Sequence, residues 1–99
     1  MAELSFLTNH AHVLLCVARD PGARLRDIAQ CVGVTERTAH RLVSELEEAG
    51  YLTRQRLGRR SFYEIHPEIP LHHPLERDHD VGEVLAVLLG DRASATHAA

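Results

Sequence analysis

The sequence predicts a mainly α-helical domain with one small β-hairpin, an α+β fold, followed by an extra C-terminal helix. Three observations support this prediction. Two short segments with apolar residues at helical spacing meet at a Gly-Val-Thr corner, residues 33–35. Residues 52–65 then read as two short strands joined by a Leu-Gly-Arg turn. The segment 81–90 is rich in apolar residues and long enough to form one more helix.

The first helix is expected to begin after Thr8 or Asn9, either of which can cap it, and to run to about Asp20. A Pro-Gly pair follows and ends it. Residues 13–18 are apolar on nearly every side. This helix should therefore be central in the fold or contact a second subunit.

A short strand is expected over residues 23–25, followed by a second helix from Arg26 to Val32. Gly33 stands where this helix must end in a left-handed conformation, which glycine adopts at little cost. Ala29 is small enough for the next helix to cross close over this one.

Thr35 offers a side-chain oxygen to the free amides that open a third helix, expected from Glu36 to Ala49 with Gly50 at its C-terminal cap. The buried stripe of this helix consists of Ala39, Leu42, Val43 and Leu46. Two helices joined by such a corner form a helix-turn-helix, whose second helix is suited to enter a DNA major groove.

The second half of the chain predicts a hairpin, a linker and a helix. Strands are expected at about Leu52–Arg56 and Ser61–Ile65, and Pro67–Pro74 reads as an extended linker because it holds three prolines. Asp78 or Asp80 can cap the last helix. The expected organisation is a DNA-binding domain over residues 1–66, a linker over 67–80, a dimerisation helix over 81–90 and a disordered tail over 91–99.

The corner resembles the helix-turn-helix signature position by position. Ala29 is followed by Gly33 four residues later, by a small apolar residue at position 39 and by Leu42 three positions further on. A Leu-Glu-Glu-Ala-Gly-Tyr-Leu segment and an arginine-rich hairpin follow. From Thr8 to His66 the chain resembles winged helix-turn-helix regulators of the broad MarR/ArsR type, in a small prokaryotic form. The resemblance implies a transcriptional regulator that binds double-stranded DNA.

The charge is distributed unevenly along the 99 residues, which suffice for one domain. The net charge of the chain is −3, but two of its segments differ in sign. Positions 19–66 hold nine arginines and seven acidic residues, whereas positions 67–99 hold two arginines and six acidic residues. Four arginines lie within the hairpin, at positions 54, 56, 59 and 60. The positive charge is therefore local, as DNA binding requires.

The outward positions near the start of the third helix are candidates for reading bases. Arg37 can bind guanine, Glu36 can accept from cytosine, and Thr38 can touch a thymine methyl group or a phosphate. His40 can donate to a base edge or a phosphate, and Arg41 corresponds to a position at which the similar regulators hold the DNA backbone. The expected DNA-binding residues are Thr35, Glu36, Arg37, Thr38, His40 and Arg41 of the helix, and Arg56, Arg59 and Arg60 of the hairpin, which is the wing of this fold.

Each assignment has a plainer alternative. The polar face of the helix can be an ordinary solvated face, and the hairpin arginines can protect a sheet edge from aggregation. Glu45, Glu47 and Glu48 would repel phosphate, so the C-terminal half of the third helix is expected to point away from the duplex.

Cys16 and Cys31 follow no Cys-x-x-Cys spacing and lie within helical patterns, which favours reduced thiols in a cytoplasmic chain. A redox switch is the alternative, but Cys16 lies in an apolar run and is expected to be an inert core thiol. The N-terminus lacks the pattern of a signal peptide, and no apolar run approaches the ~20 residues that span a bilayer.

The histidines at positions 66, 72, 73 and 79, with Asp78, invite comparison with a metal site. No cysteine lies near them and linker prolines separate them, so we expect no metal and no cofactor. The chain contains no phosphate loop, nucleophile elbow or zinc-protease helix, and no enzymatic activity is expected.

The last helix has apolar residues on more than one stripe, which predicts a homodimer. We expect its interface to include the first helix and four residues of the last: Val81, Val84, Leu85 and Leu88. Two other functions remain open from the sequence. One is a winged-helix module for protein–protein contact, and the other is a regulator that senses a metal, a thiol oxidant or a small ligand.

Overall fold

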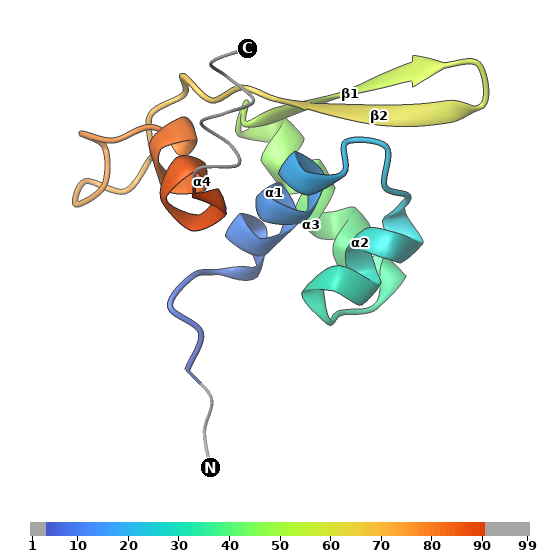
Figure 1. Ribbon diagram of the computed structural model, residues 1–99, viewed down its shortest axis with the longest axis horizontal. Coiled ribbons are helices and arrows are strands. Elements are labelled where there is room, and N and C mark those ends of the chain that lie inside the picture. Colours follow the sequence, from blue (N-terminus) through green and yellow to red (C-terminus); the bar gives the residue numbers. More distant parts are fainter. Residues whose placement is uncertain (1–3, 91–99) are drawn as a thin grey trace.

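The computed structural model describes residues 4–90 and confirms the predicted fold class (Figure 1). Helix α1 is the central element, because α2, α3, α4 and the hairpin all contact it. The hairpin lies along one edge of the helices and extends beyond them (Figure 1). The predicted tail, residues 91–99, lies outside the described residues. In chain order the elements are α1 (Asn9–Arg19), α2 (Leu25–Val32), α3 (Glu36–Glu48), β1 (Leu52–Leu57), β2 (Arg60–Ile65) and α4 (Val81–Leu89).

A single core joins the three N-terminal helices to the hairpin and to α4. Val13 of α1, Ile28 of α2 and Ala39 of α3 are wholly excluded from solvent (0%). Leu52 of β1 and Val81 of α4 are almost as deeply buried. Full burial of one Val or Ile side chain stabilises the fold by about 1.5–3 kcal/mol. The predicted central position of the first helix is thus confirmed.

The helix ends follow the predicted chemistry. Thr8 Oγ1 accepts from the Ala11 N–H at 3.3 Å and so begins α1. Gly33 adopts φ +91°, and its N–H donates to the Ala29 carbonyl at 2.8 Å, which closes α2. Asp80 and Glu83 form a reciprocal capping box at the start of α4, with both hydrogen bonds at 2.9 Å.

The predicted strand over residues 23–25 is wrong. Arg24 is the N-cap of α2, its N–H donates to Asp27 at 3.2 Å, and Leu25 already belongs to the helix. The hairpin instead meets this part of the chain through one backbone hydrogen bond, from the Tyr63 N–H to the Pro21 carbonyl at 3.0 Å. Because Asp27 can close a capping box, the local sequence favours a helix start over an extended strand.

The prediction of an extended conformation after the hairpin is also wrong. Residues 67–80 form a closed loop, held by a bridge between Pro70 and Asp80 and by the Leu71 N–H, which donates to the His79 carbonyl at 2.9 Å. Leu71 packs against the core, and the Tyr51 hydroxyl donates to the Pro70 carbonyl at 3.4 Å. Apolar residues between the prolines thus bring the segment back onto the domain.

The expectation of reduced thiols is contradicted, because a disulfide joins Cys16 to Cys31. Cys16 is buried in the middle of α1, whereas Cys31 is exposed in the last turn of α2. The packing of α2 on α1 brings their Cα atoms to 6.6 Å, within the range that a disulfide spans. Neither sequence pattern alone reveals this crossing.

The disulfide predicts a stability difference that depends on oxidation. It links residues 15 apart, and a loop of that length corresponds to about 3 kcal/mol of stabilisation, chiefly through the unfolded state. Cys31→Ser should lower the free energy of unfolding by about this amount in non-reducing buffer, measured by urea denaturation. In excess reductant the variant and the parent should unfold at the same urea concentration. Rapid alkylation of both cysteines in the unreduced parent would contradict the prediction.

Candidate nucleic-acid interface

The start of α3 is fixed by two threonines. Thr35 caps the helix by accepting from the Thr38 N–H at 3.1 Å, and its hydroxyl donates to the Thr38 hydroxyl at 3.1 Å. Thr38 itself is half-buried. The predicted cap is confirmed, and it determines how the first turn of α3 is presented to a ligand.

Helix α3 has one apolar and one polar face, as predicted. The buried residues are Ala39, Leu42, Val43 and Leu46. Outside this stripe, the predicted contact residues Glu36, Arg37, His40 and Arg41 are all exposed. The structure therefore brings these predicted residues together on one accessible helix face, beside the two threonines. Their contact with DNA stays a prediction.

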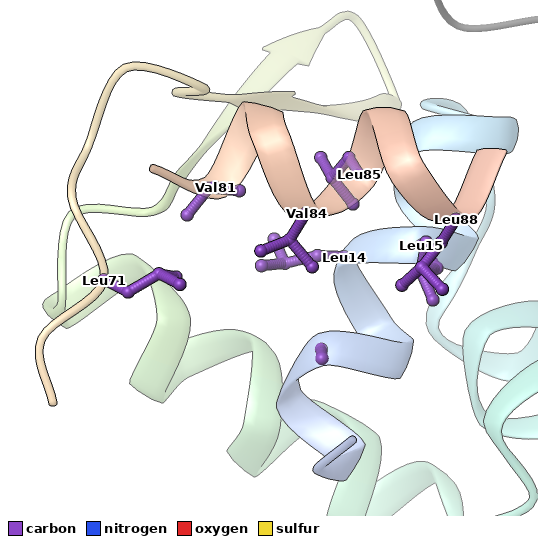
Figure 2. A pocket seen from close by; sticks show the side chains of 8 residues that line it. Leu14, Leu15, Leu71, Val81, Val84, Leu85 and Leu88 are labelled. Atoms are coloured by element: carbon purple, nitrogen blue, oxygen red, sulfur yellow. The ribbon is translucent and has the colours of Figure 1, made fainter. Parts of the chain in front are cut away.

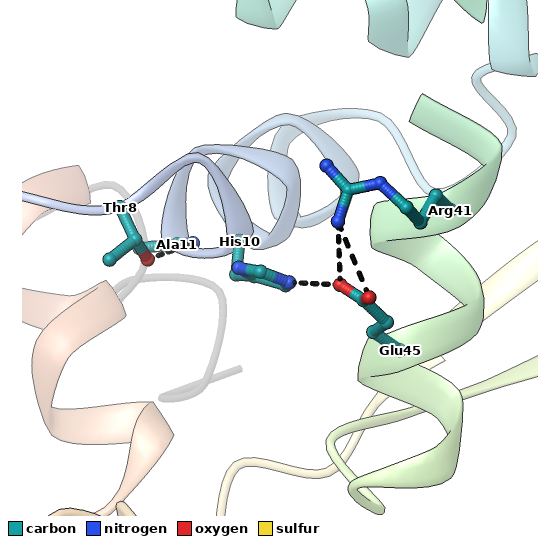
Figure 3. Close-up of polar contacts among 5 residues, drawn as sticks. All are labelled: Thr8, His10, Ala11, Arg41 and Glu45. Atoms are coloured by element: carbon teal, nitrogen blue, oxygen red, sulfur yellow. Dashed lines mark hydrogen bonds and ion pairs between the residues drawn. The ribbon is translucent and has the colours of Figure 1, made fainter. Parts of the chain in front are cut away.

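One member of this face, Arg41, is paired with Glu45, and Glu45 has a second partner on another helix. The Arg41 guanidinium donates from Nη1 to both carboxylate oxygens of Glu45, at 3.3 Å each (Figure 3). His10 Nε2 lies 2.7 Å from Glu45 Oε1. The hydrogen bond from His10 lowers the pKa of the Glu45 carboxyl, partial burial opposes the shift, and the Arg41 charge reinforces it. The i,i+4 spacing on α3 signals the first pair, but only the packing of α1 on α3 reveals the second.

The hairpin carries the other predicted residues. Its strands pair in antiparallel register, with Arg54 opposite Tyr63 and Arg56 opposite Ser61. Gly58 adopts φ +63° in the turn, a left-handed conformation that suits glycine. Arg56 and Arg59 are exposed at this tip, and neither has a hydrogen-bond or ion-pair partner within residues 4–90.

Arg60 differs from the other wing arginines because it contacts the body of the domain. Its Nη2 donates to the Gly22 carbonyl at 3.2 Å, and its guanidinium carbon lies 5.5 Å from the Phe62 ring centroid. A Cβ atom at Gly22 would come within 3.2 Å of both side chains. These contacts attach strand β2 of the wing to the turn between α1 and α2.

The histidines considered for a metal site have separate local partners. His66 hydrogen-bonds Thr53 at 2.6 Å, and the His72 ring packs on Tyr51 at a centroid distance of 4.8 Å. His79 lies 2.9 Å from Glu83, and this hydrogen bond raises the pKa of His79. Over residues 4–90, no group of three or more His, Cys, Asp or Glu side chains converges as a metal site would require.

The comparisons with known proteins now identify the family. Residues 7–56 match the IclR helix-turn-helix domain. The chain belongs to that family. The match begins just before α1 and ends within β1, so it contains the whole helix-turn-helix and the face described above. No curated protein sequence matches the chain.

Two solved structures share the fold of this IclR-type chain. The PcaV transcriptional regulator from Streptomyces coelicolor, solved with its natural ligand, superposes with a TM-score of 0.55 at 22% identity, covering 98% of this chain and 72% of PcaV. MepR, a transcription regulator of the Staphylococcus aureus multidrug efflux pump MepA, superposes with a TM-score of 0.53 at 19% identity, covering 92% of this chain and 62% of MepR.

These findings make the chain a winged helix-turn-helix DNA-binding transcription regulator. The two similar structures are of the MarR family, whereas the sequence match is to IclR. The predicted winged helix-turn-helix resemblance is thus confirmed, whereas the MarR/ArsR assignment is not, because the sequence match is to IclR.

Proposed function

We propose that the protein recognises a specific double-stranded DNA sequence with α3 in the major groove and the wing on the backbone or in the minor groove. One observation carries the proposal. Helix α3, which exposes this polar face, shares one hydrophobic core with a hairpin that has free arginines at its tip. The proposed contacts are Thr35, Glu36, Arg37, Thr38, His40 and Arg41 of α3 and its cap, and Arg56, Arg59 and Arg60 of the wing.

The roles within this set follow from the chemistry of each side chain. Arg37, in the first turn of α3, offers the paired donors that guanine O6 and N7 accept. Arg41, one turn later, is proposed to hold a phosphate. Arg60 should contribute less than Arg56 and Arg59, because its guanidinium already donates to the Gly22 carbonyl.

We also propose that the protein acts in the cytoplasm, where its DNA partner would be found. Separately, no helix among residues 4–90 has the length and apolar character that a membrane crossing requires.

A homodimer is the proposed functional state. An apolar groove of about 50 Å³ runs between α1 and α4, and Leu15 of α1 and Leu88 of α4 both line it (Figure 2). Val87 and Leu88 are 79% and 49% exposed on α4. Exposed side chains of this size, next to an apolar groove, favour contact with a second copy.

One residue of the expected dimer interface is corrected by the structure. Val81 is only 2% exposed and belongs to the core of its own protomer, so it offers a partner almost no surface. Val84 and Leu85 are half-buried in the groove, whereas Val87 and Leu88 are open to solvent. The proposed surface therefore centres on the second half of α4.

The roles of Arg37 and Arg41 predict different binding defects. Arg37→Ala should lose about 1–3 kcal/mol of binding free energy and relax preference at one base position. Arg41→Ala should weaken binding to all sequences alike. Both are measured by selecting bound sequences from random DNA and titrating the selected duplex at fixed salt. Ser44→Ala, at an exposed position of the same helix, is the matched control. Unchanged affinity and preference in Arg37→Ala would refute its assigned role.

The wing predicts a salt-dependent share of affinity. Each phosphate contact contributes about 0.9 to the slope of log affinity against log salt. Arg56→Ala with Arg59→Ala should flatten this slope by about 0.9 for every contact removed. Arg77→Ala, which removes an exposed arginine from the 67–80 loop, should change it little. If the double variant keeps the parental slope, the wing does not touch the DNA.

The dimer predicts a specific assembly defect. Val87→Asp with Leu88→Asp should yield folded monomers that bind DNA poorly, since each buried Val or Leu contributes about 1.5–3 kcal/mol to association. Light scattering measures the oligomeric state. Leu75→Asp is the control, because Leu75 is 90% exposed but lies on the 67–80 loop. A two-fold dimer would place its recognition helices about 34 Å apart and bind an inverted repeat. An unaltered chain that remains monomeric at high micromolar concentration would exclude the dimer.

A further inference from the structure

The carboxylate of Glu45 lies between two nitrogen donors from different helices (Figure 3). His10 of α1 contacts Oε1 at 2.7 Å, and Arg41 of α3 contacts both oxygens at 3.3 Å through Nη1 alone. The other two guanidinium nitrogens of Arg41 make no hydrogen bond to Glu45. The shorter of these contacts, from His10, therefore connects Glu45 of α3 to helix α1.

The geometry of both helices fixes this arrangement. Arg41 and Glu45 are four residues apart on α3, so they share the face that also holds Arg37. His10 lies in the first turn of α1, which begins at the Thr8 cap. The acidic Glu45 therefore lies on the same side of α3 as Arg37 and Arg41, which are proposed to contact DNA.

The three side chains are accessible, at 60% for Arg41, 44% for Glu45 and 41% for His10. Exposed pairs at this spacing are weak and can exchange partners. A phosphate is a strong partner for arginine, so it can draw Arg41 away from Glu45. The carboxylate would then lose one partner while facing a polyanion, and only the contact with His10 would remain.

We propose that Glu45 is an internal competitor of the DNA backbone for Arg41, and that His10 limits the competition by holding the same carboxylate. This inference rests on the proposed role of Arg41 as a phosphate contact. Glu45 and His10 are positioning residues that need not touch DNA. Together they determine how readily Arg41 becomes available, and thereby the affinity of the regulator for all sequences.

The test compares charge-matched variants on one helix. Glu45→Gln and Glu48→Gln each remove one negative charge from an exposed position of α3, but only Glu45 contacts Arg41. Affinity is measured with the full chain, at fixed salt, on a duplex that carries the selected sequence and on a duplex of unrelated sequence. Circular dichroism and thermal melting check folding, and Glu45→Ala serves as a second variant.

Glu45→Gln should bind both duplexes roughly two- to fivefold more tightly than the parent, as loss of a weak exposed pair implies, and Glu48→Gln should change binding less. His10→Ala should weaken binding, because Arg41 then becomes the sole partner of Glu45. In an Arg41→Ala background, Glu45→Gln should have no more effect than Glu48→Gln. In a Glu45→Gln background, His10→Ala should have no effect.

Equal gains from Glu45→Gln and Glu48→Gln would overturn the inference, because they would reflect the overall charge alone. A Glu45→Gln gain that survives in Arg41→Ala would overturn it as well. If Arg41→Ala itself leaves DNA binding unchanged, the proposed role of Arg41 fails and the inference fails with it. If Arg41→Ala weakens binding but the two glutamine variants behave alike, only the inference fails.

Discussion

The fold depends on the joint burial of Val13, Ile28 and Ala39, one from each of the three N-terminal helices. These side chains fill the volume that α1, α2 and α3 share, and the small Ala29 and Ala39 permit α2 and α3 to approach closely. Because this core is closely packed, the polar face of α3 cannot rotate independently of the rest. Any surface presented by Arg37 or Arg41 is therefore oriented by residues on the opposite side of the helix.

The C-terminal part of the chain extends that core. Leu52 and Tyr63 bring the base of the hairpin into it, and Val81 brings in α4. The 67–80 loop closes on itself between these two attachments, so α4 is held to the domain by its backbone as well as by its apolar face. The IclR match ends within β1, and the PcaV superposition extends over 98% of the chain. The sequence family thus describes the helix-turn-helix, whereas the fold comparison also includes the loop and α4.

Local chemistry was readable from the sequence wherever it depends on neighbours within one element. The caps at Thr8, Thr35 and Asp80, the left-handed Gly33 and the outward face of α3 all follow from spacing alone. The disulfide, the burial of Val81 and the contact of His10 with Glu45 do not. Each depends on how two helices cross, and helical periodicity gives the face of a residue but not its partner. The three prolines of residues 67–74 indicate an extended segment, but Leu71 between them packs on the core and closes the loop.

The anchoring of the wing has a consequence for conformational entropy. Arg60 and Phe62 hold strand β2 against Gly22 from the residue that follows the turn, and the Tyr63 N–H adds a backbone hydrogen bond to Pro21. The tip around Gly58 has no such support. Fixing the backbone of one residue costs about 1–2 kcal/mol. A ligand that immobilises the wing therefore meets this cost only for the few residues at the tip, while the rest of the hairpin is already ordered when the ligand arrives.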